Sequence, residues 1–253
     1  MRRSWVLAAV VGLALAAGSA RVDFAAGARA YSSGDYATAL AELTPLAEAG
    51  DAVAAYYLGE MDALGLGVPQ DSHLAVLWYM LAAAQDDAKA QYRLGMMYTF
   101  GDGVLQDYAE AARWLRLAAD QGNSDAQRVL GKKYWFGEGV PQDYAEAARW
   151  FRRAAARGDA EAQLVLGSMY ENGEGVLQDY ITAHMWFNIA AANGSKSAPG
   201  HISLNIAAAS GSEITPASRM RDAIAATMSS AEISEAQRQA KECLASNYTR
   251  CDN

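Results

Sequence analysis

The chain contains few of the residues that build metal centres and nucleophilic active sites. Its 253 residues include two cysteines and three histidines, His73, His184 and His201. No two histidines have the spacing of metal ligands, and neither cysteine lies close to a histidine in sequence. No serine lies in a Gly-x-Ser-x-Gly nucleophile turn. We therefore predict no metal, no cofactor and no catalytic residue.

Positive charge is also scarce. The chain has 21 lysines and arginines against 29 aspartates and glutamates, which gives a net charge of -8. It contains neither a run of basic residues nor a basic stripe with interleaved aromatic residues. Because an acidic surface repels a phosphate backbone, we predict that nucleic acid is not a partner.

A long apolar run occurs only near the N-terminus. Arg2 and Arg3 precede apolar residues at 6–17, and small residues follow at 18–20. This run is shorter than the about 20 residues that a membrane-spanning helix needs. The pattern predicts a signal peptide over residues 1–20 that is cleaved near Ala20, with an uncleaved anchor as the alternative. We expect a secreted or periplasmic protein without a membrane span after cleavage.

The two cysteines, Cys243 and Cys251, both lie near the C-terminus. In an oxidising compartment, a disulfide between them is the expected state. A Cys-x7-Cys spacing is not that of a redox-active pair, so a structural bridge is favoured over a redox role. Such a bridge would hold the end of the chain against the preceding helix.

The chain is built on a repeat of 36 residues. The segment Asp-Tyr-Ala-Glu-Ala-Ala-Arg-Trp at 107–114 returns unchanged at 143–150. The same offset relates four tryptophans and four glycines: Trp78, Trp114, Trp150 and Trp186, and Gly59, Gly95, Gly131 and Gly167. Four copies at a fixed period indicate a repeat array, in which the tryptophans are predicted to lie in the core.

Each copy predicts two helices. In the second copy, Asp87 is the expected N-cap of a helix that runs to about Phe100, where Gly-x-Gly ends it. Asp107 and Glu110 form an Asp-x-x-Glu pattern that predicts a capping box at the start of the next helix, and 143 and 146 repeat it. Gly95 lies within the first helix, where glycine costs about 1 kcal/mol relative to alanine. Its recurrence predicts that backbones approach too closely there for a Cβ.

The combined pattern is Ala-x-x-x-Leu-Gly-x-x-Tyr-x-x-Gly-x-Gly-Val-x-Gln-Asp-Tyr-x-x-Ala-x-x-Trp. It closely resembles the Sel-1-like repeat family, a branch of the tetratricopeptide-like solenoids. This resemblance implies an all-α, right-handed α-solenoid of antiparallel helix pairs that binds protein partners and, in most members, catalyses nothing. The first copy departs from the pattern because Asp62 replaces a tyrosine; either packing is looser there or Asp62 faces a groove.

These patterns divide the chain into eight segments. After the signal peptide we expect a capping helix pair at 21–49, four repeats at 50–85, 86–121, 122–157 and 158–193, an irregular insert with a short duplication at 194–216, and a helical cap at 217–253. Within the cap, Ser229 and Glu232 predict a capping box that opens a helix to about Ser246.

Positions that vary between copies suggest a binding face. Three of them lie at i, i+4 and i+7 of the first helix and so share one side of it. In related solenoids the first helices line the concave surface, so we predict a partner-binding groove there, with ordinary solvated side chains as the alternative. The predicted partner-binding residues are Tyr56, Glu60, Tyr92, Met96, Thr99, Arg128, Lys132, Trp135, Leu164, Ser168 and Glu171, and Ala63 occupies the remaining position.

Three functions are compatible with such a chain. The first is an exported, non-catalytic adaptor that holds a protein partner, such as an envelope sensor, a secretion component or a cell-wall component. The second is a cell-wall or β-lactam-directed hydrolase or binding protein of the cysteine-rich repeat type. Those relatives carry a disulfide in each repeat, whereas both cysteines here follow the repeats, so we predict that the chain is not an enzyme. The third is self-assembly through the ends of the superhelix.

Overall fold

The computed structural model describes residues 23–194, 215–249 and 251. All of the regular structure in these ranges is helical, as the sequence predicts. The helices are α1 (Phe24–Ser33), α2 (Tyr36–Glu48), α3 (Ala52–Leu64), α4 (Ser72–Ala83), α5 (Ala88–Phe100), α6 (Tyr108–Asp120), α7 (Ser124–Phe136), α8 (Tyr144–Ala155), α9 (Ala160–Asn172), α10 (Tyr180–Gly194), α11 (Pro216–Ala225) and α12 (Ser230–Ala245).

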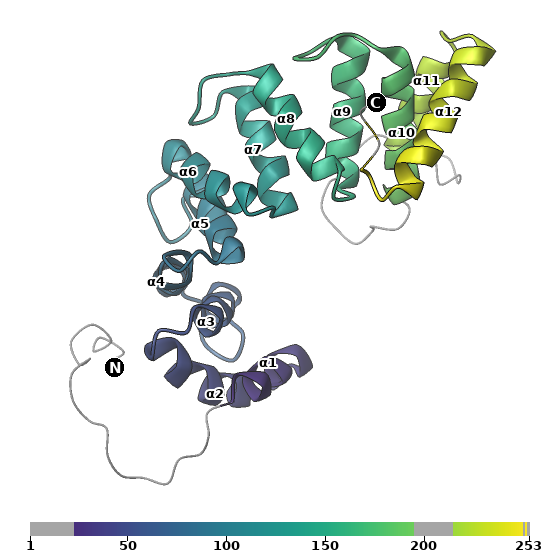
Figure 1. Ribbon diagram of the computed structural model, residues 1–253. Helices are drawn as coiled ribbons and strands as arrows, with labels where there is room; N and C mark the ends of the chain where they lie inside the picture. The colour runs from purple at the N-terminus through teal and green to yellow at the C-terminus, as the bar shows by residue number, and fades with distance from the viewer. Residues whose placement is uncertain (1–22, 195–214, 250, 252–253) are drawn as a thin grey trace, which may run out of the picture.

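The helices follow one another along a curved solenoid (Figure 1). From α1 to α10, each helix packs against its neighbours in sequence, and the buried core runs along the array between them. Such an array is stabilised within repeats and between adjacent repeats, without one central core. The predicted all-α solenoid is confirmed, and the expected signal peptide and most of the insert, including its duplicated segment, lie outside the described residues.

The first helix of each repeat begins at a polar N-cap. The side chains of the four capping residues accept a hydrogen bond from the backbone N–H three residues later, which is the usual geometry of such a cap. They are Asp51, Asp87, Asn123 and Asp159. In α5 the helix ends at Phe100 and Gly101 adopts φ 71°, so the expected bounds of this helix are confirmed.

The predicted capping boxes at the second helices are only half formed. Asp107 accepts hydrogen bonds from the backbone N–H groups of Ala109 and Glu110, but the Glu110 carboxylate binds Arg113. The backbone N–H of Asp107, which a capping box would use, donates instead to the carbonyl of Tyr98 in the preceding helix. The box prediction was wrong there because the link between the two helices already satisfies that N–H.

The recurring mid-helix glycines accommodate a side chain and not a second backbone. A Cβ on Gly95 would lie 2.6 Å from Cγ of Leu115, and one on Gly167 would lie 2.6 Å from the ring of Phe187. Tyr79 and Phe151 occupy the same position in the other two repeats. These glycines leave no room for a Cβ, as predicted, but the expected approach of two backbones was wrong: the side chain that directly follows the repeat tryptophan packs there.

The tryptophans lie partly or wholly in the core. Trp150 and Trp186 are buried, whereas Trp78 and Trp114 are half-buried against the N-terminal core cluster. Asp62, for which two environments were possible from sequence, is buried and does not face a groove. The first repeat therefore has a buried aspartate at the position where the other repeats have a half-buried tyrosine.

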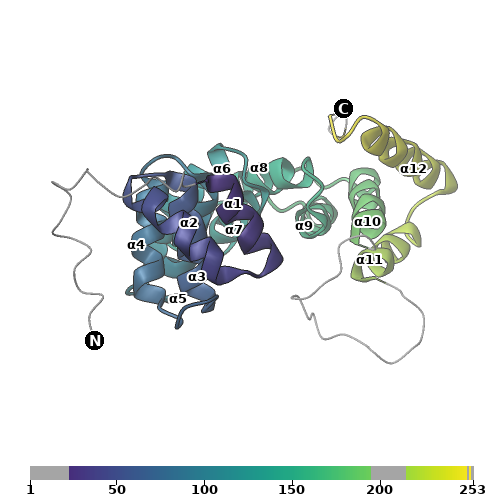
Figure 2. The ribbon, with the colours of Figure 1, turned by 90° about the horizontal axis from the view of Figure 1, so that it is seen from below.

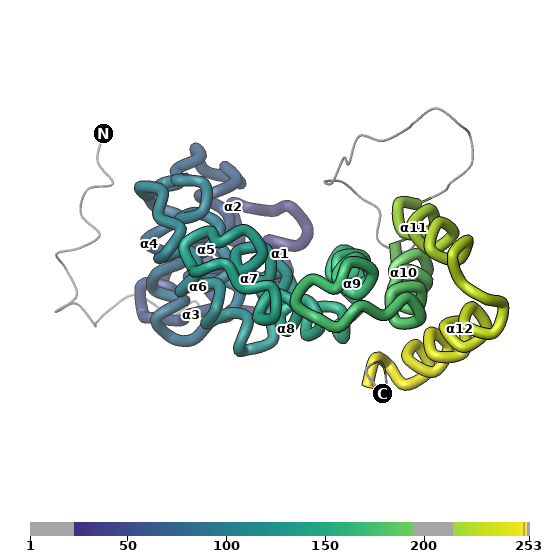
Figure 3. Tube along the Cα trace, turned by 90° about the horizontal axis from the view of Figure 1, so that it is seen from above, coloured from purple at the N-terminus to yellow at the C-terminus, as the bar shows by residue number. Residues whose placement is uncertain are grey.

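The C-terminal helices pack differently from the repeats. Both α11 and α12 contact α10, and they lie on either side of it (Figures 2 and 3). The predicted box at Ser229 and Glu232 forms completely and opens α12. The predicted disulfide between Cys243 and Cys251 is present, and it returns the chain from the end of α12 to the core around α9 and α10.

Candidate functional site on the concave face

The first helices of the hairpins lie on the inner side of the curve, as α1, α3 and α5 show most clearly in Figure 1. The helices α3, α5, α7 and α9 carry all of the predicted partner-binding residues. Glu60 is buried and the others are half-buried. Many of them also contact other residues of the chain, which the sequence analysis did not anticipate.

A charge cluster occupies the N-terminal part of this face. Glu60 is 6% exposed, and its carboxylate accepts hydrogen bonds from two of the three guanidinium nitrogens of Arg93, Nε at 2.6 Å and Nη2 at 2.7 Å. The Tyr79 hydroxyl donates to the same carboxylate at 2.5 Å. Burial, followed by the charge of Glu60, raises the pKa of Tyr56 to about 12 and also raises the pKa of Tyr79. Glu60 therefore joins α3, α4 and α5.

A second charge cluster links the third and fourth repeats. Arg128 on α7 binds Asp125 at 3.1 Å, Asp159 at 3.0 Å and Glu161 at 2.8 Å, and Lys132 also pairs with Glu161. Burial opposes the charge on Arg128, but these carboxylates hold its pKa above the usual value. Burial also raises the pKa of Asp159, against the effect of Arg128. The cluster fixes the start of α9 to α7.

Tyr92 and Met96 lie between the two clusters. Both side chains are half-buried against the core cluster of the middle repeats. Burial, followed by the charge of Asp125, raises the pKa of Tyr92, while Arg128 and Arg93 oppose this effect. One turn further along α5, the Thr99 hydroxyl donates to the carbonyl of Gly95 at 2.8 Å. An aromatic and a thioether side chain therefore remain partly accessible at the middle of the face.

The remaining predicted residues have different environments. Trp135 packs edge-on against Tyr144, at 5.8 Å between ring centroids, and against Phe151 at 6.0 Å. Leu164 packs against the cluster that contains Ile224 of α11. Ser168 and Glu171 are half-buried beyond that point.

A row of exposed apolar side chains at the ends of the first helices was not predicted from the sequence. Leu64, Phe100 and Phe136 occupy the last position of α3, α5 and α7, and Phe100 is 71% exposed. Leu105 and Leu177, in the loops that follow, are about 90% exposed. The 36-residue period of large apolar residues directly before a helix-ending glycine is the signal that could have found this row.

Within the described ranges, no group of three or more His, Cys, Asp or Glu side chains could hold a metal ion. His184 is buried against the cap and His73 is exposed, while His201 lies outside the described residues. None of the helices in the described part of the chain is long and apolar enough to cross a membrane.

Comparison with protein families matches the Sel1 repeat four times, at residues 52–87, 88–123, 124–159 and 160–195. No curated protein matches the chain. Among solved structures, a Sel1 repeat protein from Oxalobacter formigenes is 33% identical with a TM-score of 0.66, and the match covers 68% of this chain and 71% of that one.

Two further solved structures have lower identity. A protective antigen of uropathogenic Escherichia coli with an SLR fold is 24% identical with a TM-score of 0.52, over 88% of this chain and 54% of that one. Helicobacter pylori cysteine rich protein B is 23% identical over 50% of this chain and 91% of that one, but its TM-score of 0.40 is too low to carry an argument. The four repeat matches and the Oxalobacter structure establish the family: the chain belongs to the Sel1 repeat family.

Proposed function

We propose that this protein is an exported, non-catalytic adaptor that holds a protein partner on its concave face. Sel1 repeats generally serve as scaffolds for protein–protein interaction. The observation that carries the proposal for this chain is the pairing of half-accessible Tyr92 and Met96 between two clusters whose charged side chains pair with one another. Aromatic and methionine side chains are enriched at interfaces, whereas charged side chains are depleted from interface cores.

The two charge clusters support this arrangement by holding the face rigid. Arg93 with Glu60 ties α5 to α3, and Arg128 with Asp159 ties α7 to α9. A face that is ordered before binding loses less conformational entropy when a partner docks. The partner that fits best presents an apolar or aromatic side chain to Tyr92 and Met96, with polar groups toward the clusters on either side.

Export is part of the proposal. The basic and apolar residues at the N-terminus support it, and so does the Cys243–Cys251 disulfide, because disulfides persist in oxidising compartments. A secretion component, an envelope sensor or a cell-wall component is a partner of the kind found in that compartment. Fractionation of the host cell tests this part, and recovery of the full-length chain in the cytoplasmic fraction would contradict it.

The adaptor role is tested with a variant that changes the face and leaves the charge clusters in place. Tyr92→Ala combined with Met96→Ala is expected to reduce capture of the partner from an envelope extract by at least tenfold. The matched control is Leu77→Ala with Leu117→Ala, which removes exposed side chains from the second helices α4 and α6. Equal capture by both variants, with helicity unchanged in circular dichroism, would refute the concave face as the binding site.

The same preparation distinguishes the other functions. Light scattering over a range of concentrations measures the mass, and growth of the mass with concentration would favour self-assembly through the ends of the solenoid. Hydrolysis of a chromogenic β-lactam by the purified chain, lost on a single substitution, would favour the hydrolase. A constant monomer mass and no hydrolysis are the outcomes expected of the adaptor.

A further inference from the structure

Buried glutamines recur on the first helices and hold the turn that joins one repeat to the next. The side-chain amide of Gln91 donates to the carbonyl of Ala83 at 3.3 Å, and that of Gln127 donates to Ala119 at 2.9 Å. Gln163 makes the same bond, to Ala155 at 3.0 Å. Each amide therefore adds a second hydrogen bond to a carbonyl at the end of the preceding helix, which also accepts one from the backbone N–H three residues later.

The side-chain oxygens of these glutamines are satisfied unequally. Gln91 Oε1 accepts a hydrogen bond from Gln121 Nε2 at 2.8 Å, and Gln163 Oε1 accepts one from Asn193 Nδ2 at 2.9 Å. At the junction between them, the equivalent donor position is occupied by Arg157. Gln127 is 3% exposed, and its Oε1 has no hydrogen-bond partner in the described part of the chain. A buried acceptor without a donor is destabilising.

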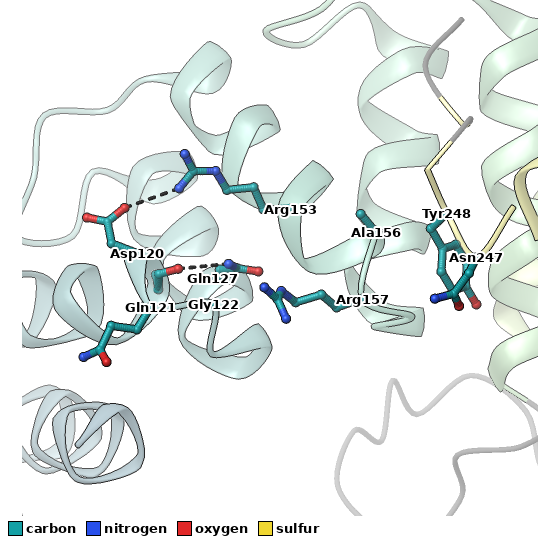
Figure 4. Close-up of a pocket in the computed structure, with 10 residues that line it drawn as sticks. Asp120, Gln121, Gly122, Gln127, Arg153, Ala156, Arg157, Asn247 and Tyr248 are labelled. Carbon is teal, nitrogen blue, oxygen red and sulfur yellow. Dashed lines mark hydrogen bonds and ion pairs between the residues drawn. The ribbon is translucent and has the colours of Figure 1, made fainter. Parts of the chain in front are cut away.

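Gln127 and Arg157 line a hollow of about 740 Å³. Figure 4 shows Gln127 and Arg157 pointing toward one another at its edge. Arg157 lies against Gly122, where a Cβ would collide with its guanidinium group. Arg153 also lines the hollow and binds Asp120 at 3.3 Å. Among the described residues, no carboxylate forms an ion pair with Arg157.

The far wall of the hollow comes from the end of the chain. Asn247 and Tyr248 line it, with φ angles of 52° and 67°, in the left-handed region that few residues other than glycine adopt. The Tyr248 hydroxyl accepts a hydrogen bond from Asn193 Nδ2 at 2.7 Å. The disulfide and this bond therefore hold a strained turn opposite Gln127 and Arg157.

We propose that this hollow binds a terminal carboxylate with an adjacent N–H group, as found at the end of a peptide chain or in a free amino acid. The carboxylate binds the guanidinium group of Arg157, whose planar donors match its two oxygens. Gln127 Oε1 has almost no exposed surface, so the Arg157 side chain must shift as it binds the carboxylate. The N–H then donates to Gln127 Oε1 and supplies the hydrogen bond that Gln121 supplies at the preceding junction. The residues of this site are distinct from those of the concave face, so it is a second site.

The two required groups exclude simpler ligands. An inorganic anion such as sulfate would satisfy Arg157 but would bring only lone pairs to Gln127 Oε1. A neutral amide would satisfy Gln127 but would leave the guanidinium group without a counter-charge. Only a ligand with both groups in close proximity completes the junction as its two neighbours are completed.

The test is a titration of the full chain, with its disulfide intact, by N-acetyl-alanyl-alanine and two matched compounds. The first matched compound is the C-terminal amide of the dipeptide, which lacks the carboxylate. The second is N-acetyl-alanyl-lactate, in which an ester oxygen replaces the required N–H. Chemical shift changes in NMR spectra should show at least tenfold weaker binding for both compounds. Free alanine separates the two sources: its binding shows that a single amino acid suffices, and its failure beside a binding dipeptide identifies a peptide end.

A variant that copies the neighbouring repeat closes the site. Arg157→Gln places at this junction the residue that binds Gln91 at the preceding one, so it should abolish binding and keep or raise the melting temperature. Arg149→Gln is the control, because Arg149 pairs with Glu146 on the surface of α8, away from the hollow. No binding of either the dipeptide or free alanine at ~10 mM, equal binding of acid and amide, or unchanged binding by Arg157→Gln would each overturn the proposal.

Discussion

The repeats and the C-terminal cap are both helical, but they are held together in different ways. In the repeats, a large side chain of each second helix packs onto a bare glycine of the first, and the helices contact their sequence neighbours in turn. In the cap, α11 and α12 both dock on α10, with few fully buried side chains of their own. A disulfide and the hydrogen bond between Asn193 and Tyr248 hold the end of the chain in place.

The difference shows how a solenoid ends. A repeat buries its apolar face against the next repeat, so the last repeat needs a cover that does not offer the same face again. Here α11 covers the last repeat with Ile224. The Cys243–Cys251 disulfide adds stability to the cap, whose own core is small. Changes in the repeats should therefore affect the whole array, whereas changes in the cap should remain local.

The largest expected effect comes from removing a side chain that packs on a repeat glycine. Phe151 is fully buried against Gly131, and Phe151→Ala should lower the free energy of unfolding by about 3–5 kcal/mol. Urea denaturation followed by circular dichroism measures this change. The matched variant in the cap, Ile224→Ala, should expose α11 to hydrogen exchange and leave the main transition in place. An equal shift of the main transition by both variants would remove the distinction between the two regions.

Loss of the disulfide should have the next largest effect, and this effect should be confined to the cap. Cys243 and Cys251 are separated by eight positions, and closing so short a loop contributes about 2.5 kcal/mol on the chain-entropy model. Cys251→Ser should therefore raise hydrogen exchange in α12 and in the turn after it. If the exchange of α3 to α8 rose as well, the cap would be coupled to the whole array.

A smaller effect is expected from adding one methyl group to a repeat glycine. Gly167→Ala gains helix propensity, but the new Cβ would lie 2.6 Å from the Phe187 ring, so we expect a net loss of about 1–2 kcal/mol. Gly131→Ala is the control, because the closest approach to Phe151 is 3.0 Å and the loss should be smaller. Thermal unfolding of both variants measures the difference, and a gain in stability at Gly167 would show that the ring moves aside freely.

The smallest effect concerns the dependence of cap docking on pH. Burial, followed by the charge of Arg221, lowers the pKa of His184, while Asp222 opposes the shift. Because the unfolded chain then binds the proton more readily, this contribution to stability is present above pH 6.5 and is lost as the pH falls toward the lowered pKa. Hydrogen exchange of α11 should therefore rise between pH 7.5 and pH 5.5, after correction for the intrinsic rate. In His184→Gln this added rise should disappear, and its persistence would assign the effect to another group.

The sequence predicts much of the fold because period and helix boundaries are local properties. The aspartate caps and the helix-ending glycines lie within a few residues of the structure that they specify, and the expected bounds of α5 agree with the structure. The residue that packs on each glycine was missed because it varies between Tyr79, Leu115 and phenylalanine. The neighbouring tryptophan is the same in every repeat, so it was taken as the main core residue. Constancy across repeats therefore did not identify this packing contact.

The candidate sites were less predictable from sequence. The bond between Arg128 and Asp159 joins side chains 31 positions apart, and no repeat pattern specifies which charges meet across a junction. Half-burial of Tyr92 depends in the same way on neighbours in other helices. The unpaired oxygen of Gln127 can be recognised only after the two satisfied glutamines have been located in the structure. Partner binding by the concave residues stays a prediction.

The contacts between successive helices have a mechanical consequence. From α1 to α10 the main contacts of each described helix are with its neighbours in sequence, so the bend of the molecule depends on its separate junctions. A small rotation at the junction of Gln127 and Arg157 would therefore change the angle between the repeats before it and the repeats after it. Binding of the proposed ligand at that junction would thereby change the distance between the two ends of the solenoid, far from the ligand itself.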